Sequence, residues 1–236
     1  MNTRDLSHAT QGQTAKEKMT AGKALRERVP RTAHAQWACP ADRPDPIDLL
    51  KHADRGRLPE LLPIRYGRMR QSPFAFFRGA GAMMAMDLAT TPQTGIRVQT
   101  CGDCHVRNFG GFGSPERRLV FDINDFDETL NAPWEWDVKR LATSIVLKDR
   151  QIGARDRSCE EAVLAAVASY REHLREYARM RALDVWYSKL DAEIFIEEAK
   201  TATAKKHWER VEDKAKSQTA EHVFPRITDV VKGHPR

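Results

Sequence analysis

The sequence predicts an α+β fold in which a small sheet or pair of β-hairpins is packed by helices. Three strand-like segments lie close together in the middle of the chain, at residues 95–100, 108–112 and 117–123. Segments with apolar residues at helical spacing precede and follow them. A turn sequence, GSPER, separates the last two strands, so these two should form a hairpin.

The elements before the strands are mostly helical. Residues 1–45 are polar, basic and interrupted by prolines, which predicts a loosely ordered arm with one short helix near 15–28. The stretch DPIDLLKHADRGRLPELLPIRYGRM supplies a short amphipathic helix and a turn. Ser72 and the proline after it suit the start of a buried helix that ends near Thr90.

Two longer helices are expected after the strands. The first follows Pro133 and ends at Gly153, which suits the position just beyond a helix C-terminus. The second begins with Ser158 and Glu161 in a capping-box pattern and continues with apolar residues at alternating spacings of four and three. A further charged helical region covers about 190–216.

Length and composition indicate a globular protein with its main domain at 46–223 and a tail at 224–236. The 236 residues are 41% hydrophobic and 31% charged. No long apolar run and no apolar leader is present, so we expect a cytoplasmic protein without a membrane span. The net charge of +6 permits phosphate-rich partners. We expect no nucleic-acid binding, however, because the basic residues are dispersed and no binding motif accompanies them.

The stretch CGDCHVRNFGGF allows several interpretations. Cys101, Cys104 and His105 match the C-x-x-C-H signature of c-type haem attachment, and they could also supply part of a zinc site. Haem attachment normally needs an exported protein and a second axial ligand. Zinc needs four ligands, and Cys39 and Cys159 are isolated. We therefore expect no haem and no zinc, interpret all four cysteines as free thiols, and expect Cys101 and Cys104 to be buried beside the strand.

A phosphotransfer site accounts for more residues of the same stretch. Asp103 and Asn108 have the D-x-x-x-x-N spacing of a kinase catalytic loop, in which the carboxylate orients or deprotonates a hydroxyl and the amide binds Mg²⁺. The acidic stretch FDINDFDET follows at the end of the predicted hairpin. Carboxylate and amide oxygens are suitable Mg²⁺ ligands, although such a stretch can also be an ordinary solvated turn.

These motifs also resemble a known family. The segments RYGRMRQSPFAFFRGA, GDCHVRNFG, FDINDFDET and PWEWDVKRLATS closely resemble the bacterial proteins grouped as domain of unknown function 2252, with matching character from about Arg28 to Tyr187. More distantly, GDCHVRNFG followed by FDINDFDE is similar to the paired motifs of aminoglycoside-phosphotransferase-like kinases. This resemblance implies the fold of a kinase-like catalytic lobe.

The distant resemblance implies a role for each matching residue. It makes Asp103 the catalytic aspartate, Asn108 the metal-binding amide and Asp125 the metal-binding aspartate, with Asp127 as a second candidate. It gives His105 a structural or orienting role, while Cys101 departs from the histidine of the related motif. Asp137 resembles the aspartate that braces the catalytic loop, although a carboxylate there also suits an ordinary helix N-terminus.

Three arginines, Arg65, Arg68 and Arg78, are candidates for binding phosphate because guanidinium geometry suits it. No glycine-rich loop or strand lysine precedes Asp103. The resemblance implies that longer family members carry both in their later half, so we expect this chain to be shortened. The leading expectation is Mg²⁺-dependent, ATP-using phosphotransfer to an unidentified acceptor. The alternative is a non-catalytic module that binds a nucleotide, an anion or a protein.

Overall fold

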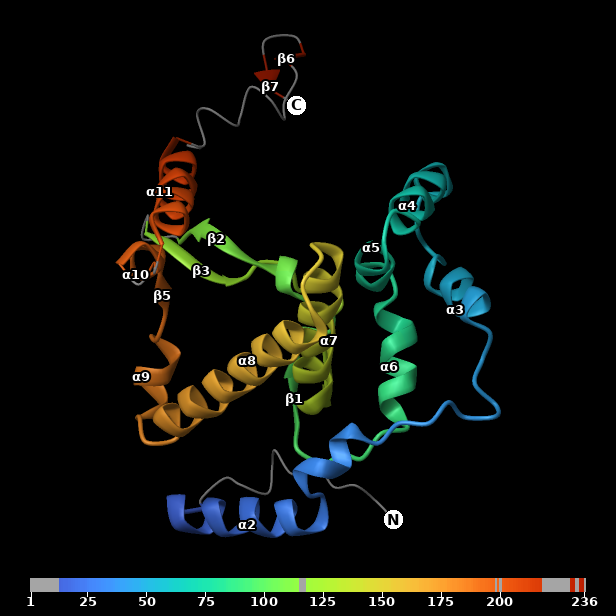
Figure 1. The fold of residues 1–236 in the computed structure, drawn as a ribbon. Coiled ribbons are helices and arrows are strands. Elements are labelled where there is room, and N and C mark those ends of the chain that lie inside the picture. Colours follow the sequence, from blue (N-terminus) through green and yellow to red (C-terminus); the bar gives the residue numbers. More distant parts are fainter. Residues whose placement is uncertain are drawn as a thin grey trace. The chain divides into compact units, whose positions relative to one another are not determined.

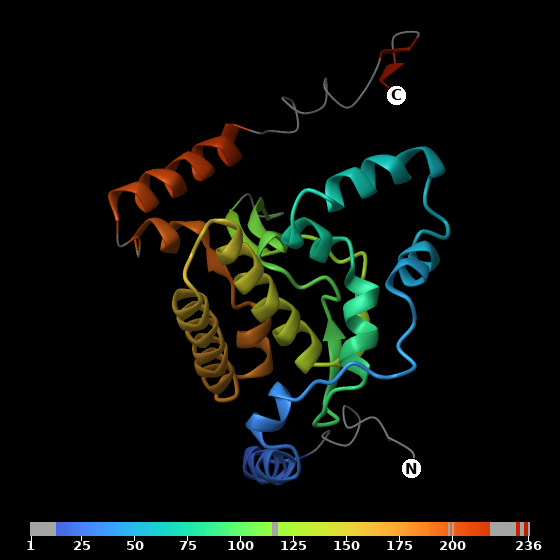
Figure 2. The ribbon, with the colours of Figure 1, turned by 45° about the vertical axis from the view of Figure 1, so that its right-hand side comes forward.

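The computed structural model describes residues 13–114, 118–197, 199, 201–217, 230–231 and 234–235 (Figure 1, Figure 2). Its helices and small antiparallel sheets confirm the predicted α+β class. Residues 1–12, most of the predicted turn at 113–117 and most of the tail at 224–236 lie outside the described residues. No helix in the described part of the chain is long and apolar enough to cross a membrane.

The chain divides into two units, each formed by two separate segments. Unit 1 comprises Met1–Asn108 and Asp125–Met180, and unit 2 comprises Phe109–Asn124 and Arg181–Arg236. Every candidate site residue named above belongs to unit 1.

Unit 1 begins with the predicted helix near residue 15. Helix α2 covers Ala15–Arg28 and starts with a capping box, in which Thr14 and Glu17 each bond the other's backbone N–H. A 3-10 turn, η1, follows at Arg31–Ala35. The predicted amphipathic helix is α3, Pro46–Ala53, and the side chain of Asp45 caps its N-terminus.

The single helix predicted from Ser72 to Thr90 is wrong, because the segment forms two helices. After η2 (Pro59–Leu61) and α4 (Leu62–Met69), the chain forms α5 at Pro73–Arg78 and α6 at Gly81–Ala89. The side chain of Ser72 does cap α5, as expected.

The break between α5 and α6 lies at Gly79, and contacts with α4 explain it. The Arg65 side chain donates a 2.7 Å hydrogen bond to the Gly79 carbonyl. Met69 packs so closely against Gly79 that a Cβ there would lie 2.6 Å from its sulfur. Apolar periodicity alone does not reveal these contacts, which come from a neighbouring helix.

A two-stranded sheet joins the segments on either side of the predicted hairpin. Strand β1 (Arg97–Thr100) pairs antiparallel with β4 (Leu130–Pro133), from Arg97 opposite Pro133 to Thr100 opposite Leu130. The Thr100 hydroxyl also donates to the Leu130 carbonyl at 2.8 Å. Strand β4 was not predicted, because its sequence, LNAP, is too short to show a strand pattern and ends in a proline.

Helices α7 (Glu135–Gln151) and α8 (Asp156–Tyr177) pack against each other and confirm the two predicted long helices. Gly153, with φ 81°, follows the end of α7 as expected. The capping box predicted at Ser158 is wrong, because α8 begins two residues earlier and has no side-chain cap. Glu161 instead pairs with Arg157 at 2.9 Å.

Unit 2 contains the predicted hairpin, formed by β2 (Phe109–Gly113) and β3 (Leu119–Ile123). A short strand that was not predicted, β5 (Leu190–Asp191), extends the hairpin to a three-stranded sheet. The rings of Phe121, Phe195 and Trp208 pack together, with centroids 4.6 to 5.8 Å apart.

The remaining elements of unit 2 are short, and the predicted helical region at 190–216 is interrupted. It forms β5 followed by two helices. The elements that complete the unit are α9 (Ala182–Trp186), α10 (Ala192–Glu197), α11 (Ala202–Ser217) and a small hairpin of β6 (Val230–Val231) with β7 (His234–Pro235).

Candidate active site

Helix α7 holds the loop that follows β1 at two points. The carboxylate of Asp137 accepts hydrogen bonds from the backbone N–H groups of Cys101, at 2.7 Å, and Gly102, at 3.2 Å. Further along the helix, the Ser144 hydroxyl accepts one from the N–H of Val106 at 3.1 Å. Burial raises the pKa of Asp137, and the two backbone hydrogen bonds oppose this rise. The position of the loop therefore depends on one face of α7.

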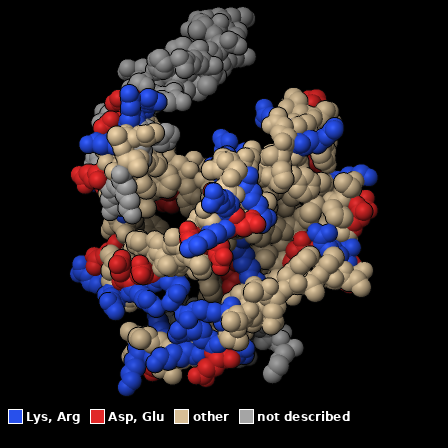
Figure 3. Space-filling model, viewed as in Figure 1, with Lys and Arg blue, Asp and Glu red and all other residues tan. Residues whose placement is uncertain are grey.

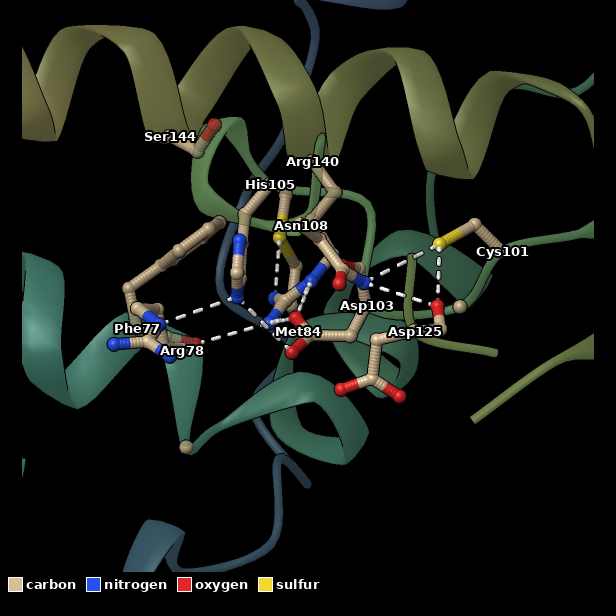
Figure 4. Close-up of polar contacts among 12 residues, drawn as sticks. Phe77, Arg78, Met84, Cys101, Asp103, His105, Asn108, Asp125, Arg140 and Ser144 are labelled. Carbon is tan, nitrogen blue, oxygen red and sulfur yellow. Dashed lines mark hydrogen bonds and ion pairs between the residues drawn. The ribbon is translucent and has the colours of Figure 1, made fainter. Parts of the chain in front are cut away.

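The amide of Asn108 connects this loop to the acidic stretch. Its Nδ2 group donates to the main-chain carbonyls of Asp103 and Asp125, both at 3.1 Å, and lies 3.7 Å from the Cys101 sulfur (Figure 4). Asn108 is buried at the end of the short 3-10 turn Val106–Asn108. The two sequence motifs, 17 residues apart at this contact, are thus joined through one side chain.

Both oxygens of the Asp103 carboxylate have partners. The Nε group of Arg140 donates to Oδ1 at 2.8 Å, and a second nitrogen of the same guanidinium also contacts this oxygen. His105 Nε2 lies 3.3 Å from Oδ2. Burial raises the pKa of Asp103, but the hydrogen bond from His105 and the charge of Arg140 outweigh it, so the net pKa is lowered. Asp103 is therefore ionised and fixed in direction.

Arg140 is a site residue that the sequence analysis missed. Its side chain is only 3% exposed and donates to the Phe77 carbonyl at 3.0 Å. The guanidinium also lies over the Phe77 ring, 4.3 Å from its centroid, and contacts the Met84 sulfur at 3.6 Å. One available signal was its position three residues after Asp137, on the same face of a predicted helix.

The part of the acidic stretch that belongs to unit 1 starts at Asp125. Asp125 and Asp127 are exposed, and Oδ1 of Asp125 accepts a 3.4 Å hydrogen bond from the N–H of Asp127. Their carboxylates are therefore accessible oxygen ligands, whereas the backbone carbonyl of Asp125 is held by Asn108.

The acidic stretch passes close to the loop that contains Asp103, and the two backbones meet at Glu128 and Gly102. We call this contact the loop crossing. Gly102 has φ 83°, and a Cβ there would overlap the Glu128 carbonyl oxygen. The Glu128 carboxylate itself lies against Gly81 at the start of α6. Desolvation raises the pKa of Glu128, and the negative charge of Asp103 raises it further. Glycine at 102 thus permits the close approach of the two loops.

The three predicted phosphate-binding arginines have different surroundings. Arg78 is exposed, and its Nε group donates to His105 Nε2 at 3.3 Å. That nitrogen cannot accept from Arg78 and donate to Asp103 at once, so the two contacts compete. Arg65 bonds Gly79 and pairs with Asp54 at 3.4 Å, which makes it part of the packing between helices. Arg68 lies exposed on α4.

A cavity of about 410 Å³ lies beside the loop crossing within unit 1. Apolar side chains from α3 and α6 form much of its lining, and the polar residues that line it beside Gly102 are Arg57, Arg65, Thr100, Glu128 and Asp137. The Trp136 indole also lines it, and its N–H has no hydrogen-bond partner within the described part of the chain. The cavity has the size of a small-molecule site.

Cys101 and Cys104, the cysteines of the C-x-x-C-H signature, are buried free thiols. Burial raises the pKa of Cys101 to about 11 and raises that of Cys104 as well. Both are therefore protonated near neutral pH, in the form that neither binds metal nor reacts as a nucleophile. Among the described residues, no group of three or more His, Cys, Asp and Glu side chains is arranged to hold a metal ion.

Comparison with known proteins places these motifs within a single family. No curated protein and no solved structure matches the chain. The family described as "Uncharacterized protein conserved in bacteria (DUF2252)" matches residues 57–236. The match begins at residue 57, later than the start near Arg28 that the sequence suggested, and it extends past Tyr187, where that resemblance ended. It includes every candidate site residue. The chain therefore belongs to the DUF2252 family of uncharacterized bacterial proteins.

Proposed function

We propose that this chain carries the catalytic-lobe part of a kinase-like phosphotransferase that uses ATP and Mg²⁺ and acts on a substrate hydroxyl. The observation that carries the proposal is the Asn108 amide, which bonds the main chain at both Asp103 and Asp125. A phosphotransfer site of this kind needs its catalytic aspartate and its metal ligands in one place. The loop contacts support that arrangement.

The side chains suit Mg²⁺ in chemical type. Nδ2 of Asn108 is occupied by main-chain carbonyls, which leaves its Oδ1 as a ligand, and the Asp125 and Asp127 carboxylates are exposed. Mg²⁺ commonly takes one or two carboxylates and completes its shell with phosphate oxygens and water. These three residues would hold the ion. Bound with ATP, the ion would neutralise charge on the phosphates.

The state of Asp103 favours an orienting role. A general base works best with a pKa near the working pH, whereas the pKa of Asp103 is lowered. Its carboxylate is ionised and held by Arg140, so it would accept a hydrogen bond from the substrate hydroxyl and direct it.

Binding of the phosphates would rely on Arg78 in this unit. The four lysines before Asp103 lie on helices, three on α2 and one on α3. Arg78 is exposed beside His105 and has a guanidinium suited to phosphate.

A second function has one observation in its favour. Both oxygens of Asp103 are engaged by Arg140 and His105, as in a carboxylate that only stabilises a fold. The alternative is a non-catalytic module that binds a nucleotide, an anion or another protein. It differs from the first proposal in predicting ligand binding without phosphate transfer.

Calorimetry with ATP, in the presence and absence of Mg²⁺, tests the metal site. We expect Mg²⁺-dependent binding by the wild-type chain and a loss of at least about tenfold in Asp125→Ala, because the variant removes a ligand but keeps the bonded carbonyl. Asp122→Ala is the matched control, because this exposed carboxylate accepts a hydrogen bond from the N–H of Ile123 and has no other bond within the described residues. Absence of Mg²⁺-dependent ATP binding in the wild type would contradict the proposal.

Phosphate transfer from ATP, to water or to added hydroxyl compounds, then separates the two functions. In an enzyme, Asp103→Asn should retain ATP binding and lose most of the transfer rate. Binding without any transfer by the wild type supports the non-catalytic module. An unchanged transfer rate in Asp103→Asn would rule out its role in directing the substrate.

A further inference from the structure

Arginines from distant parts of the sequence gather on one face of unit 1. We define the arginine patch as Arg26 on α2, Arg31 in η1, and Arg171 and Arg175 on α8, all of them exposed. Figure 1 and Figure 2 agree that α2 and η1 lie beside the C-terminal half of α8. Figure 3 shows Lys and Arg gathered over this part of the molecule, towards the lower left.

The location of α2 is fixed by a contact outside the patch. Arg28, in the last turn of α2, donates a 2.8 Å hydrogen bond to the carbonyl of Thr94. Thr94 is itself held by Glu135 at the start of α7, through hydrogen bonds of 2.8 Å and 2.7 Å. The end of α2 is thereby tied to the body of unit 1, which keeps Arg26 and Arg31 close to α8.

The charges of the patch repel one another. The positive charge of Arg171, together with those of Arg26 and Arg175, lowers the pKa of the Arg31 guanidinium. None of the four forms an ion pair among the described residues, although glutamates follow Arg26, Arg171 and Arg175 in the sequence. Among the described residues, the four guanidinium groups are therefore not held by ion pairs and remain available to an anionic partner.

We propose that the arginine patch binds the phosphate backbone of a nucleic acid without regard to base sequence. Guanidinium groups match phosphate geometry, and a chain of phosphates can contact several of them together. Binding would also release counterions condensed on the nucleic acid, which favours association. This surface acts independently of the chemistry at Asp103.

A membrane surface fits the patch less well than a nucleic acid does. Helices that lie on bilayers carry a broad apolar face beside their basic residues. On α2, the only large apolar side chain that is exposed is Met19. On α8, Leu164 and Leu174 are exposed, and Tyr170 is partly covered by Trp134, with which it stacks at a centroid distance of 6.3 Å. The exposed apolar side chains of the two helices are few and stand among charged residues, which differs from the broad apolar face of a helix that lies on a bilayer.

Fluorescence anisotropy with labelled single-stranded and duplex oligonucleotides of about 20 nucleotides, in mixed sequence, tests the proposal. If four arginines contact phosphates, the slope of log K against log salt should be about −3 to −4. Affinity should then fall about 60- to 250-fold between 50 mM and 200 mM salt. Oligonucleotides of different base sequence should bind with similar affinity. Absence of binding at 50 mM salt would overturn the proposal.

Two double variants with the same change in net charge locate the surface. Arg171→Gln with Arg175→Gln should reduce the slope to about −2 and weaken binding at low salt. Arg150→Gln with Arg157→Gln is the control, because these arginines are paired with Asp156 and Glu161. Circular dichroism checks that both variants keep their helices. Equal weakening by the two variants, or tighter binding to anionic lipid vesicles than to oligonucleotides, would overturn the assignment.

Discussion

At the scale of single residues, the candidate site depends on side chains that hold backbone in place. Asp137 binds two N–H groups of the Asp103 loop, and Asn108 binds two carbonyls. Arg140 fixes the Asp103 carboxylate and reaches Phe77 on α5. These contacts leave little freedom for Asp103, so its direction is set before any ligand binds.

Gly102→Ala should destabilise the protein more than the same change at Gly56. Both glycines have positive φ, 83° and 86°, a backbone conformation that costs an L-residue about 1–2 kcal/mol. A Cβ at Gly102 would also overlap the carbonyl oxygen of Glu128, whereas nothing lies within 4 Å at Gly56. Denaturant unfolding of the two variants measures the difference. Equal losses of unfolding free energy in the two variants would show that the backbone of Glu128 does not lie close to Gly102.

At the scale of elements, α7 organises the site. Asp137, Arg140 and Ser144 are spaced by three and four residues, which places them on one face of the helix. This face meets the loop at Cys101, Asp103 and Val106. The helix itself was predictable from its apolar residues, but the role of its polar face was not.

Helix caps offer a test of the element boundaries. Thr14→Ala should cost about 1 kcal/mol in the local stability of α2, because it removes the cap that bonds Glu17 N–H. Since α2 buries no side chain, the loss should appear as faster amide hydrogen exchange within that helix. Ser158→Ala should change the stability of α8 by less than about 0.5 kcal/mol, because Ser158 caps nothing. A large loss at Ser158 would contradict this boundary.

At the scale of the whole molecule, carboxylates of the site give opposite contributions to stability as pH changes. Folding lowers the pKa of Asp103, so this carboxylate stabilises the folded protein at pH values above its unfolded pKa. That stabilisation is lost as the pH falls through the pKa of the folded state. Folding raises the pKa of Glu128, so the protonated side chain stabilises the folded protein at low pH. That stabilisation is lost as the pH rises and Glu128 loses its proton. Ionised Glu128 therefore opposes folding at neutral pH.

Glu128→Gln should make the protein more stable than wild type at pH 7, with the difference disappearing below about pH 4. Asp103→Asn should have the opposite sign at pH 7, with a loss of about 3–5 kcal/mol because it leaves Arg140 buried without its partner. Denaturant unfolding across this pH range measures both. A Glu128→Gln difference that does not grow with pH would show that desolvation of this carboxylate is negligible.

The basic residues are distributed differently along the chain and in the folded structure. Along the chain the basic residues are dispersed, and that dispersion led to the expectation of no nucleic-acid partner. The fold brings Arg26 and Arg31 beside Arg171 and Arg175, which lie about 140 residues later. The proposed binding surface and that expectation make opposite predictions, which the oligonucleotide titration decides.

Local sequence by itself determined the α+β class, the main helices, the β2–β3 hairpin and the two motif loops. Helical spacing, turn residues and motif order act over a few residues, so they can be read without the fold. Only the tertiary structure decided the break at Gly79, the pairing of β4 with β1, the partners of Asp103 and the arginine patch. Each of these arises where distant segments pack together, and no local pattern encodes such contacts.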